Sequence, residues 1–89
     1  MKRFILFKAS KDIFPLIGDV IKMLVGNRIT VSEIDDLLLI IYSDFNVLEV
    51  KNTIQSLETD LNMQITCYCS YLSEDIDLEL KLVLPLLKE

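Results

Sequence analysis

The stretch Leu37-Leu38-Leu39-Ile40-Ile41-Tyr42 lies between an acidic approach, Asp35-Asp36, and a polar exit, Ser43-Asp44. A short apolar run with no polar alternation is typical of a strand that is buried on both faces of a sheet. It is too short to cross a bilayer as a helix, which takes about 20 residues. We therefore expect this stretch to form a central strand of a sheet.

The composition predicts one small domain. The chain has 89 residues, of which 52% are hydrophobic, and a formal net charge of −5. Because an acidic surface repels a phosphate backbone, we do not expect direct nucleic-acid binding. The apolar run 4–7 after Met1-Lys2-Arg3 is shorter than the roughly 7–15 apolar residues of a signal peptide, so we expect neither export nor a membrane segment. The high apolar content predicts that a partner, or sequence absent from this chain, covers part of the surface.

Two cysteines, Cys67 and Cys69, stand two residues apart in a strand-like segment. Their Cα atoms are expected to lie at or beyond the limit of about 7 Å for a disulfide bond. A zinc site needs about four ligands, and the chain has no His and no third Cys. We therefore expect buried free thiols, no metal ion and no cofactor, in the reducing environment of the cytoplasm.

Two helices are predicted from apolar residues spaced by three and four. In the first, Asp12 is the expected N-cap, Pro15 falls in the first turn, and Gly26 supplies the stop. In the second, Asn46 and Glu49 resemble a capping box ahead of an apolar stripe. The inward positions are Ile13, Ile17, Val20, Ile21 and Leu24 in the first helix, and Val47, Val50, Ile54, Leu57 and Leu61 in the second.

Three more strands are predicted. Residues 3–9 form another apolar run, residues 28–32 are a brief β-branched stretch, and residues 64–71 alternate between two faces. The segment Glu33-Ile34-Asp35 is the expected turn of a hairpin. The alternating segment is typical of a half-exposed strand at a sheet edge. One of its faces carries Met63, Ile65, Cys67, Cys69 and Tyr71, and the other carries Gln64, Thr66, Tyr68 and Ser70.

The tail fits two kinds of secondary structure between residues 74 and 84. Its apolar residues alternate as in a strand, and they also follow the spacing of a helix. Ser73 as a cap, with Glu74 and Asp75 in the first turn, favours the helix. We expect a helical extension over residues 73–89 that packs on a domain formed by residues 1–72. The alternating set is Ile76, Leu78, Leu80, Leu82 and Leu84, and the helical set is Ile76, Leu80, Val83, Leu84 and Leu87.

These elements follow one another as β-α-β-β-α-β, with the C-terminal helix after them. With right-handed crossovers, this order gives a four-stranded antiparallel sheet with strand order 4-1-3-2. The prediction is a ferredoxin-like fold of the α+β class, with two helices on one face of the sheet. It puts the two continuous apolar runs in the centre and the short and the alternating strands at the edges, where their sequences fit.

The central strands are apolar on both faces, although two helices cover only one face. We therefore expect the other face to dock against the C-terminal helix, a second copy of the chain or a neighbouring domain. The candidate interface residues come from the two apolar runs. They are Leu37, Leu38, Leu39, Ile40, Ile41, Tyr42, Phe4 and Leu6.

A strand, a helix and a hairpin with an acidic turn before a long apolar strand resemble the GGDEF-type nucleotide cyclase domain. The pattern is closer still to the degenerate GGDEF-like domain of PucR/CdaR-type bacterial transcriptional regulators. The resemblance covers most of residues 1–72. It rests on the order of the elements, on Glu33-Ile34-Asp35-Asp36-Leu37 at the place of the cyclase turn, and on the segment 57–71.

The resemblance does not extend to catalysis. The cyclase turn needs two glycines so that the backbone can approach the nucleotide, and Glu33 and Ile34 occupy those places. The family carries a metal-binding carboxylate near the end of the first strand, where this chain has Lys8-Ala9-Ser10. We therefore expect no enzymatic activity and no catalytic residues, and we interpret Asp35 and Asp36 as solvated turn residues.

The leading prediction is a non-catalytic regulatory or interaction domain of a bacterial transcriptional regulator, which dimerises or docks through its sheet. The alternative prediction is a small-molecule sensor similar to the ACT domains, which share this order of elements. Such a sensor would bind a metabolite at a dimer interface near residues 8–18. The glycine-rich loop of ACT domains is missing from that segment.

Overall fold

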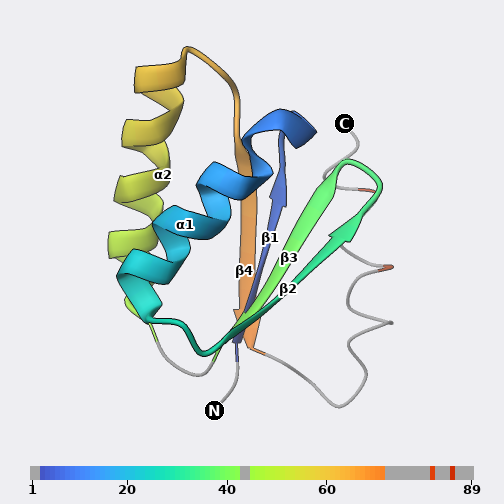
Figure 1. The fold of residues 1–89 in the computed structure, drawn as a ribbon, viewed down its shortest axis with the longest axis vertical. Helices are drawn as coiled ribbons and strands as arrows, with labels where there is room; N and C mark the ends of the chain where they lie inside the picture. Colours follow the sequence, from blue (N-terminus) through green and yellow to red (C-terminus); the bar gives the residue numbers. More distant parts are fainter. Residues whose placement is uncertain (1–2, 43–44, 72–80, 82–84, 86–89) are drawn as a thin grey trace.

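The computed structural model of the chain describes residues 3–42, 45–71, 81 and 85 (Figure 1). The predicted helical extension over residues 73–89, and with it the predicted boundary between two parts of the chain, lies outside the described residues apart from positions 81 and 85. In chain order, the elements are β1 (Arg3–Lys8), a short 3₁₀ helix (Lys11–Ile13), α1 (Phe14–Val25), β2 (Ile29–Ile34), β3 (Leu37–Tyr42), α2 (Val47–Leu61) and β4 (Thr66–Tyr71).

The four strands form one sheet in the order β2-β3-β1-β4, and every neighbouring pair is antiparallel. This is the predicted order 4-1-3-2 read from the opposite edge, so the α+β class and the strand order are confirmed. The two apolar runs, β1 and β3, are the central strands. Unbroken apolar runs are typical of strands buried on both faces, and β1 and β3 are the most buried of the four strands.

The register divides the central strands between two faces of the sheet. Ile5 pairs with Ile40, and Leu6 pairs with Leu39. Because successive side chains of a strand point to opposite faces, Ile5 and Ile40 lie on one face and Leu6 and Leu39 on the other. Both helices pack on the face of Ile5 and Ile40, which we call the inner face, and we call the opposite face the outer face.

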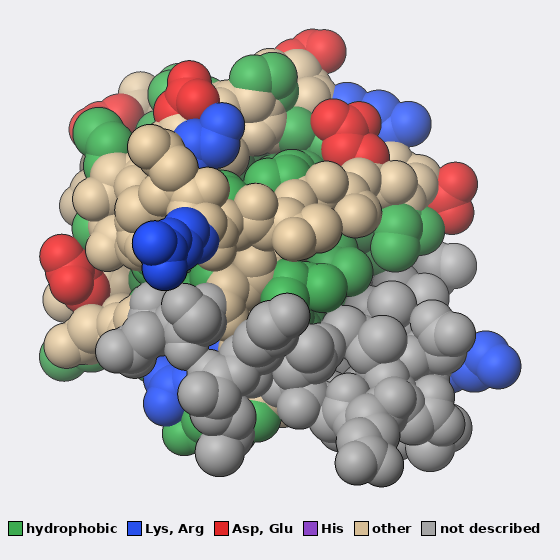
Figure 2. Space-filling model, turned by 60° about the horizontal axis from the view of Figure 1, so that its bottom comes forward, with side chains coloured by type: hydrophobic (Ala, Val, Ile, Leu, Met, Phe, Trp, Pro, Cys, Tyr) green, Lys and Arg blue, Asp and Glu red, His purple; other side chains and the backbone are tan. Residues whose placement is uncertain are grey.

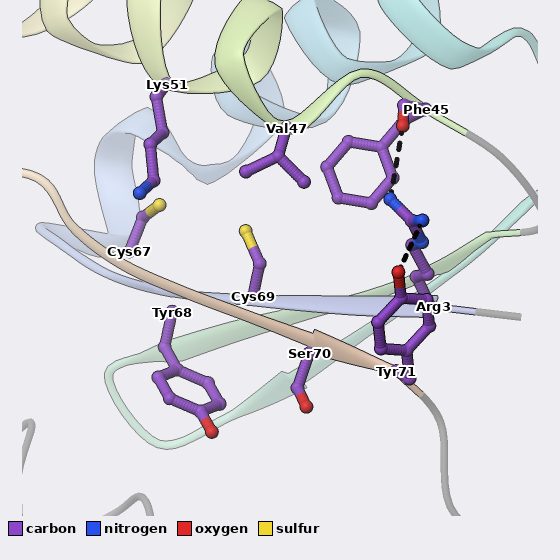
Figure 3. A pocket seen from close by; sticks show the side chains of 9 residues that line it. All are labelled: Arg3, Phe45, Val47, Lys51, Cys67, Tyr68, Cys69, Ser70 and Tyr71. Atoms are coloured by element: carbon purple, nitrogen blue, oxygen red, sulfur yellow. Dashed lines mark hydrogen bonds between the residues drawn. The ribbon is translucent and has the colours of Figure 1, made fainter.

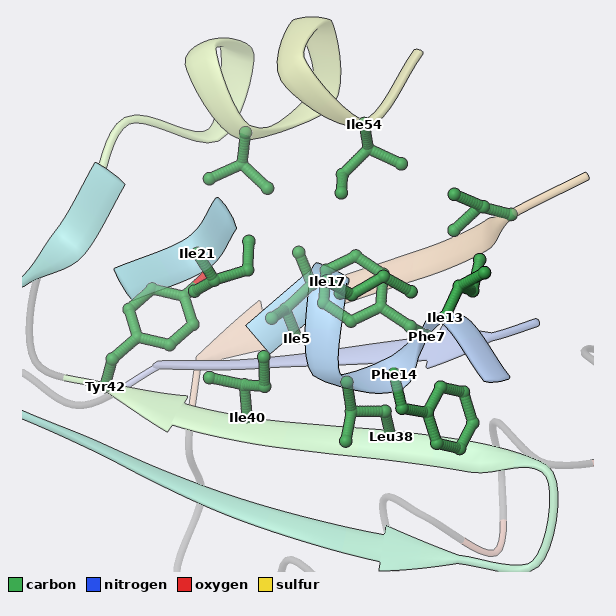
Figure 4. Close-up of a cluster of buried hydrophobic side chains, with 12 residues drawn as sticks. Ile5, Phe7, Ile13, Phe14, Ile17, Ile21, Leu38, Ile40, Tyr42 and Ile54 are labelled. Atoms are coloured by element: carbon green, nitrogen blue, oxygen red, sulfur yellow. The ribbon is translucent and has the colours of Figure 1, made fainter. Parts of the chain in front are cut away.

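The hydrophobic core fills the space between the inner face and the two helices. In Figure 4, Ile17 and Ile21 of α1 and Ile54 of α2 point toward the strands. Burying an apolar side chain of this size contributes roughly 1.5–3 kcal/mol, so this layer is a large source of stability. Its members are Ile5, Phe7, Ile13, Phe14, Ile17, Ile21, Leu38, Ile40, Tyr42, Val50, Ile54 and Ile65.

Two predicted boundaries are wrong in detail. Asp12 is not the N-cap of α1, because it lies within the 3₁₀ helix and the cap position is Ile13, which makes no side-chain capping bond. The hairpin turn is Asp35-Asp36, and Glu33 and Ile34 belong to β2. Asp35 adopts a left-handed backbone with φ of 53°, a conformation that aspartate tolerates better than most residues.

The predicted cap of α2 is confirmed. The side-chain oxygen of Asn46 accepts a hydrogen bond of 3.2 Å from the backbone N–H of Glu49. At the other end, Asn62 ends the helix in a left-handed conformation with φ of 50°. The Glu58 carboxylate then accepts a hydrogen bond of 2.8 Å from the backbone N–H of Ile65. This contact ties the end of α2 to the chain entering β4, and so fixes α2 beside that edge strand.

Candidate functional site

The predicted interface residues lie on both faces of the sheet. Leu38, Ile40 and Tyr42 belong to the core beneath the helices. The others, by strand alternation and register, share the outer face. The structure therefore separates the predicted set into three core residues and one continuous apolar group. The outer-face group consists of Phe4, Leu6, Leu37, Leu39 and Ile41.

The outer-face group is covered, although both helices pack on the inner face. The side chains of Phe4 and Leu6 are 0% exposed, and those of Leu37 and Leu39 are 4% and 6% exposed, whereas Ile41 is half-buried. On the same face, the ring of Tyr68 from β4 lies 6.1 Å from the ring of Phe4. On the face of the molecule drawn in Figure 2, hydrophobic side chains lie in several patches among polar and charged ones.

A second candidate site is a pocket of about 280 Å³ between α2 and β4, which we call the α2–β4 pocket. Figure 3 shows both cysteine sulfur atoms on the side of β4 that faces α2, with the Lys51 side chain reaching down toward Cys67. Tyr68 and Ser70 point to the other side of the strand. The side chains used below are Arg3, Phe45, Val47, Lys51, Cys67 and Cys69, all of which line the pocket.

Arg3 is held rigidly at one end of this pocket. Its guanidinium group donates hydrogen bonds to the carbonyl oxygen of Phe45 (3.3 Å) and to the hydroxyl oxygen of Tyr71 (2.8 Å). The guanidinium carbon lies 4.5 Å from the centre of the Tyr71 ring and 5.2 Å from that of Phe45. At these distances the two rings attract the guanidinium group, so these contacts hold a positive charge at the pocket wall.

The two thiols differ in acidity. The neighbouring Cys67 thiol lowers the pKa of Cys69, partial burial opposes this shift, and the positive charges of Lys51 and Arg3 add to it. The pKa of Cys67 is raised above its usual value by the Cys69 thiol and by burial. Both residues are free thiols, and they are half-buried, whereas the sequence predicted buried ones.

The sequence predicted part of this pocket. Alternation put Cys67, Cys69 and Tyr71 on one face of a strand, and the structure confirms it. The sequence did not predict that Arg3 and Lys51 would line the same pocket. Arg3 reaches the pocket because β1 pairs with β4, and this pairing brings Arg3 beside Tyr71 although the two residues are far apart in the sequence. The pocket also lies apart from residues 8–18, where the resemblance to ACT domains would place a ligand, and none of those residues lines it.

The acidic turn does not contribute to either site. Asp35 and Asp36 are exposed at the tip of the hairpin. Within residues 3–42 and 45–71, no group of three or more His, Cys, Asp or Glu side chains could hold a metal ion. Among the helices that the structure describes, none combines the length and the apolar character needed to span a membrane.

Comparison of the sequence with protein-family models finds no match, and comparison with curated proteins finds no similar sequence. The function is therefore argued from the two sites themselves.

Proposed function

We propose that this chain is a non-catalytic interaction domain that docks a protein segment on the outer face of its sheet. The observation that carries the proposal is the outer-face group, whose side chains Phe4, Leu6, Leu37 and Leu39 are at most 6% exposed although α1 and α2 pack on the inner face. Soluble proteins rarely expose a contiguous apolar patch of this kind to water. Where such a patch occurs, it is usually a surface that binds another segment or molecule.

The outer face is a good docking platform because it belongs to the two central strands. β1 and β3 are each hydrogen-bonded on both sides, so their backbone is held while the side chains are presented as a flat layer. Burial of apolar surface contributes about 25 cal/mol per Å². Five large apolar side chains then supply a binding energy that does not depend on any hydrogen bond.

The occupant that we assign to the outer face is the segment 72–89 of the same chain. This segment directly follows β4, the strand hydrogen-bonded to β1, so the covering segment would need no long connection. Its sequence is rich in apolar residues at the spacing that an amphipathic segment needs. They are Leu72, Ile76, Leu78, Leu80, Leu82, Val83, Leu84, Leu86 and Leu87.

The proposal includes the ferredoxin-like arrangement, which the strand order β2-β3-β1-β4 and the two helices on one face support. It also includes a regulatory setting, which rests on the resemblance to the degenerate GGDEF-like domain of bacterial transcriptional regulators. No catalytic step is proposed, because among the described residues Asp35 and Asp36 belong to no group of three or more side chains that could hold a metal ion.

The mass of the full chain in solution tests the choice of occupant. Light scattering over a concentration series is expected to give the mass of a single chain throughout, because the segment that covers the outer face belongs to the same molecule. A dimer that dissociates when Leu39→Asp is introduced, while circular dichroism stays unchanged, would assign the face to a second copy instead.

A further inference from the structure

The α2–β4 pocket has a positively charged side chain at each of its two ends, and the proposed docking on the outer face uses neither of them. Figure 3 shows Lys51 entering the pocket from α2 at one end and Arg3 entering it from β1 at the other, beside Tyr71. Between the two charged groups, Val47 of α2 and Cys69 of β4 lie on opposite sides of the space. The pocket therefore has two cationic ends and an apolar middle.

The spacing of the two ends follows from the geometry of β4. Arg3 pairs with Tyr71 in the β1–β4 register and donates a hydrogen bond to its hydroxyl oxygen, whereas the Lys51 side chain reaches toward Cys67 (Figure 3). Residues 67 and 71 lie on the same side of the strand, and at about 3.3 Å per residue they are roughly 13 Å apart. One compact anion, such as phosphate, is too small to contact both charges. A ligand that contacts both therefore carries a negative charge at each end of a short chain.

Neither cation is neutralised by a carboxylate within residues 3–42 and 45–71, although the chain has a net charge of −5. Glu58, which lines a neighbouring groove together with Lys51, accepts a hydrogen bond from the backbone instead. The guanidinium group of Arg3 keeps further N–H donors beyond its two hydrogen bonds, and the Tyr71 hydroxyl, which accepts one of these bonds, still has its own hydrogen to donate. This end of the pocket is therefore a preformed set of donors for a carboxylate.

We propose that the α2–β4 pocket binds a small linear dicarboxylate, with about five or six carbon atoms, whose two carboxylates meet the two cationic ends. One carboxylate accepts hydrogen bonds from Arg3 and from the Tyr71 hydroxyl, and the other pairs with Lys51. The methylene groups between them pack against Val47 and Cys69. The pocket volume of about 280 Å³ equals that of about nine water molecules in the liquid, which matches ligands of roughly nine or ten non-hydrogen atoms, such as glutarate and adipate.

The two cysteines contribute apolar surface to this site. A thiol behaves as a small hydrophobic group with a weak S–H donor. Cys67 and Cys69 both pack against the hydrophobic core, and both turn their sulfur atoms toward the space below α2 (Figure 3). Ligand pockets in proteins are commonly lined in this way, by apolar groups with a few polar groups that fix the orientation of the ligand. No covalent step at sulfur is part of the proposal.

The first test is a titration of the full chain, followed through the backbone amide signals in ¹H–¹⁵N NMR spectra at constant ionic strength. Adipate is expected to give saturable shifts at residues 51 and 67–71, and to bind at least about fivefold more tightly than hexanoate, which has the same chain length and one carboxylate. Adipamide, which carries no charge, is expected to bind more weakly than either. Equal affinity for adipate and hexanoate, or no saturable shift at these residues, would overturn the proposal.

The length of the ligand tests the spacing of the two ends. Malonate carries the same charge as adipate, but its carboxylates are too close together to contact Arg3 and Lys51 at once. It is therefore expected to bind at least about fivefold more weakly than adipate, with an affinity near that of a single carboxylate. Malonate that binds as tightly as adipate would show that the pocket attracts any dianion, which contradicts the assignment of one carboxylate to each end.

Matched variants assign each end of the ligand. Lys51→Gln is expected to remove the advantage of adipate over hexanoate, because the second carboxylate loses its partner, and to leave the affinity for hexanoate nearly unchanged. Arg3→Lys keeps the charge but loses the planar set of donors, so it is expected to weaken the binding of both ligands. Lys22→Gln on α1 is the control, because the Lys22 side chain is exposed and does not line the pocket. Circular dichroism confirms that each variant is folded. Equal losses of adipate affinity in Lys51→Gln and Lys22→Gln would trace the binding to overall charge and contradict the proposed site.

Discussion

The hydroxyl group of Tyr42 is buried without a hydrogen-bond partner in the described part of the chain. The Tyr42 side chain is 3% exposed, and its ring meets the ring of Phe45 edge-on with the centres 4.3 Å apart. Burial raises the pKa of Tyr42 above its usual range, and the nearby Cys69 adds to the shift. The group therefore remains a neutral hydroxyl, and it carries the desolvation cost of an unpaired polar atom.

Replacing Tyr42 by phenylalanine is expected to stabilise the protein. Tyr42→Phe removes the unpaired hydroxyl and keeps the ring contact with Phe45, so the free energy of unfolding should rise by about 1 kcal/mol. Urea denaturation measures the change. Tyr71→Phe is the matched control, because it removes a hydroxyl that accepts a hydrogen bond from Arg3, and it should not stabilise. A loss of stability in Tyr42→Phe would mean that its hydroxyl is paired.

The two glycines of α1 lie in different backbone conformations, one inside the helix and one at its C-terminal end. Gly18 lies inside the helix, and a Cβ added there would meet no atom within 4 Å. Gly26 ends the helix with φ of 85°, and its N–H donates to the Lys22 carbonyl oxygen over 2.9 Å. Only Gly26 therefore needs the freedom of a residue without a side chain.

Gly18→Ala is expected to stabilise the protein by about 1 kcal/mol, because alanine loses less backbone entropy than glycine in a helix and has room here. Gly26→Ala is expected to destabilise it by a similar amount, since φ of 85° strains a residue with a Cβ. Thermal and urea denaturation of the two variants test the pair. Destabilisation by Gly18→Ala would reveal a close contact at that position.

The sequence predicted best those elements whose signals lie within one short segment of the chain. β1 and β3 were recognised from unbroken apolar runs, and α2 from Asn46 and the stripe behind it. The start of α1 was misplaced because the 3₁₀ helix takes up Asp12. The hairpin turn was placed too early because Ile34 pairs with Leu37 and closes the turn to two residues.

The candidate sites were harder to predict because they depend on contacts between distant segments. Alternation placed both cysteines on one face, but the approach of Lys51 depends on how α2 lies across β4, which the hydrogen bond from Ile65 to Glu58 helps to fix. The outer-face group could not be separated from Leu38, Ile40 and Tyr42 without knowing which face the helices cover.

At the scale of the whole molecule, the sheet has a hydrophobic layer on each side. The inner layer is closed by α1 and α2, and the outer layer is as well buried at Phe4 and Leu6 as the core is. A domain of this size buries a smaller fraction of its surface on folding than a larger domain does, so its stability depends on most of its buried apolar side chains. We therefore expect the occupant of the outer face to be part of the stable fold as well as of the docking function.

The measurement that tests this account most directly is the reactivity of a thiol introduced by Leu39→Cys in the full chain that also carries Cys67→Ser and Cys69→Ser. The matched control is Ser32→Cys in the same background, because Ser32 pairs directly with Leu39 and is exposed. We predict that position 39 reacts at least about tenfold more slowly than position 32, and that dilution leaves this ratio unchanged, since the occupant belongs to the same chain. Equal rates at the two positions, or protection that disappears on dilution, would contradict the account.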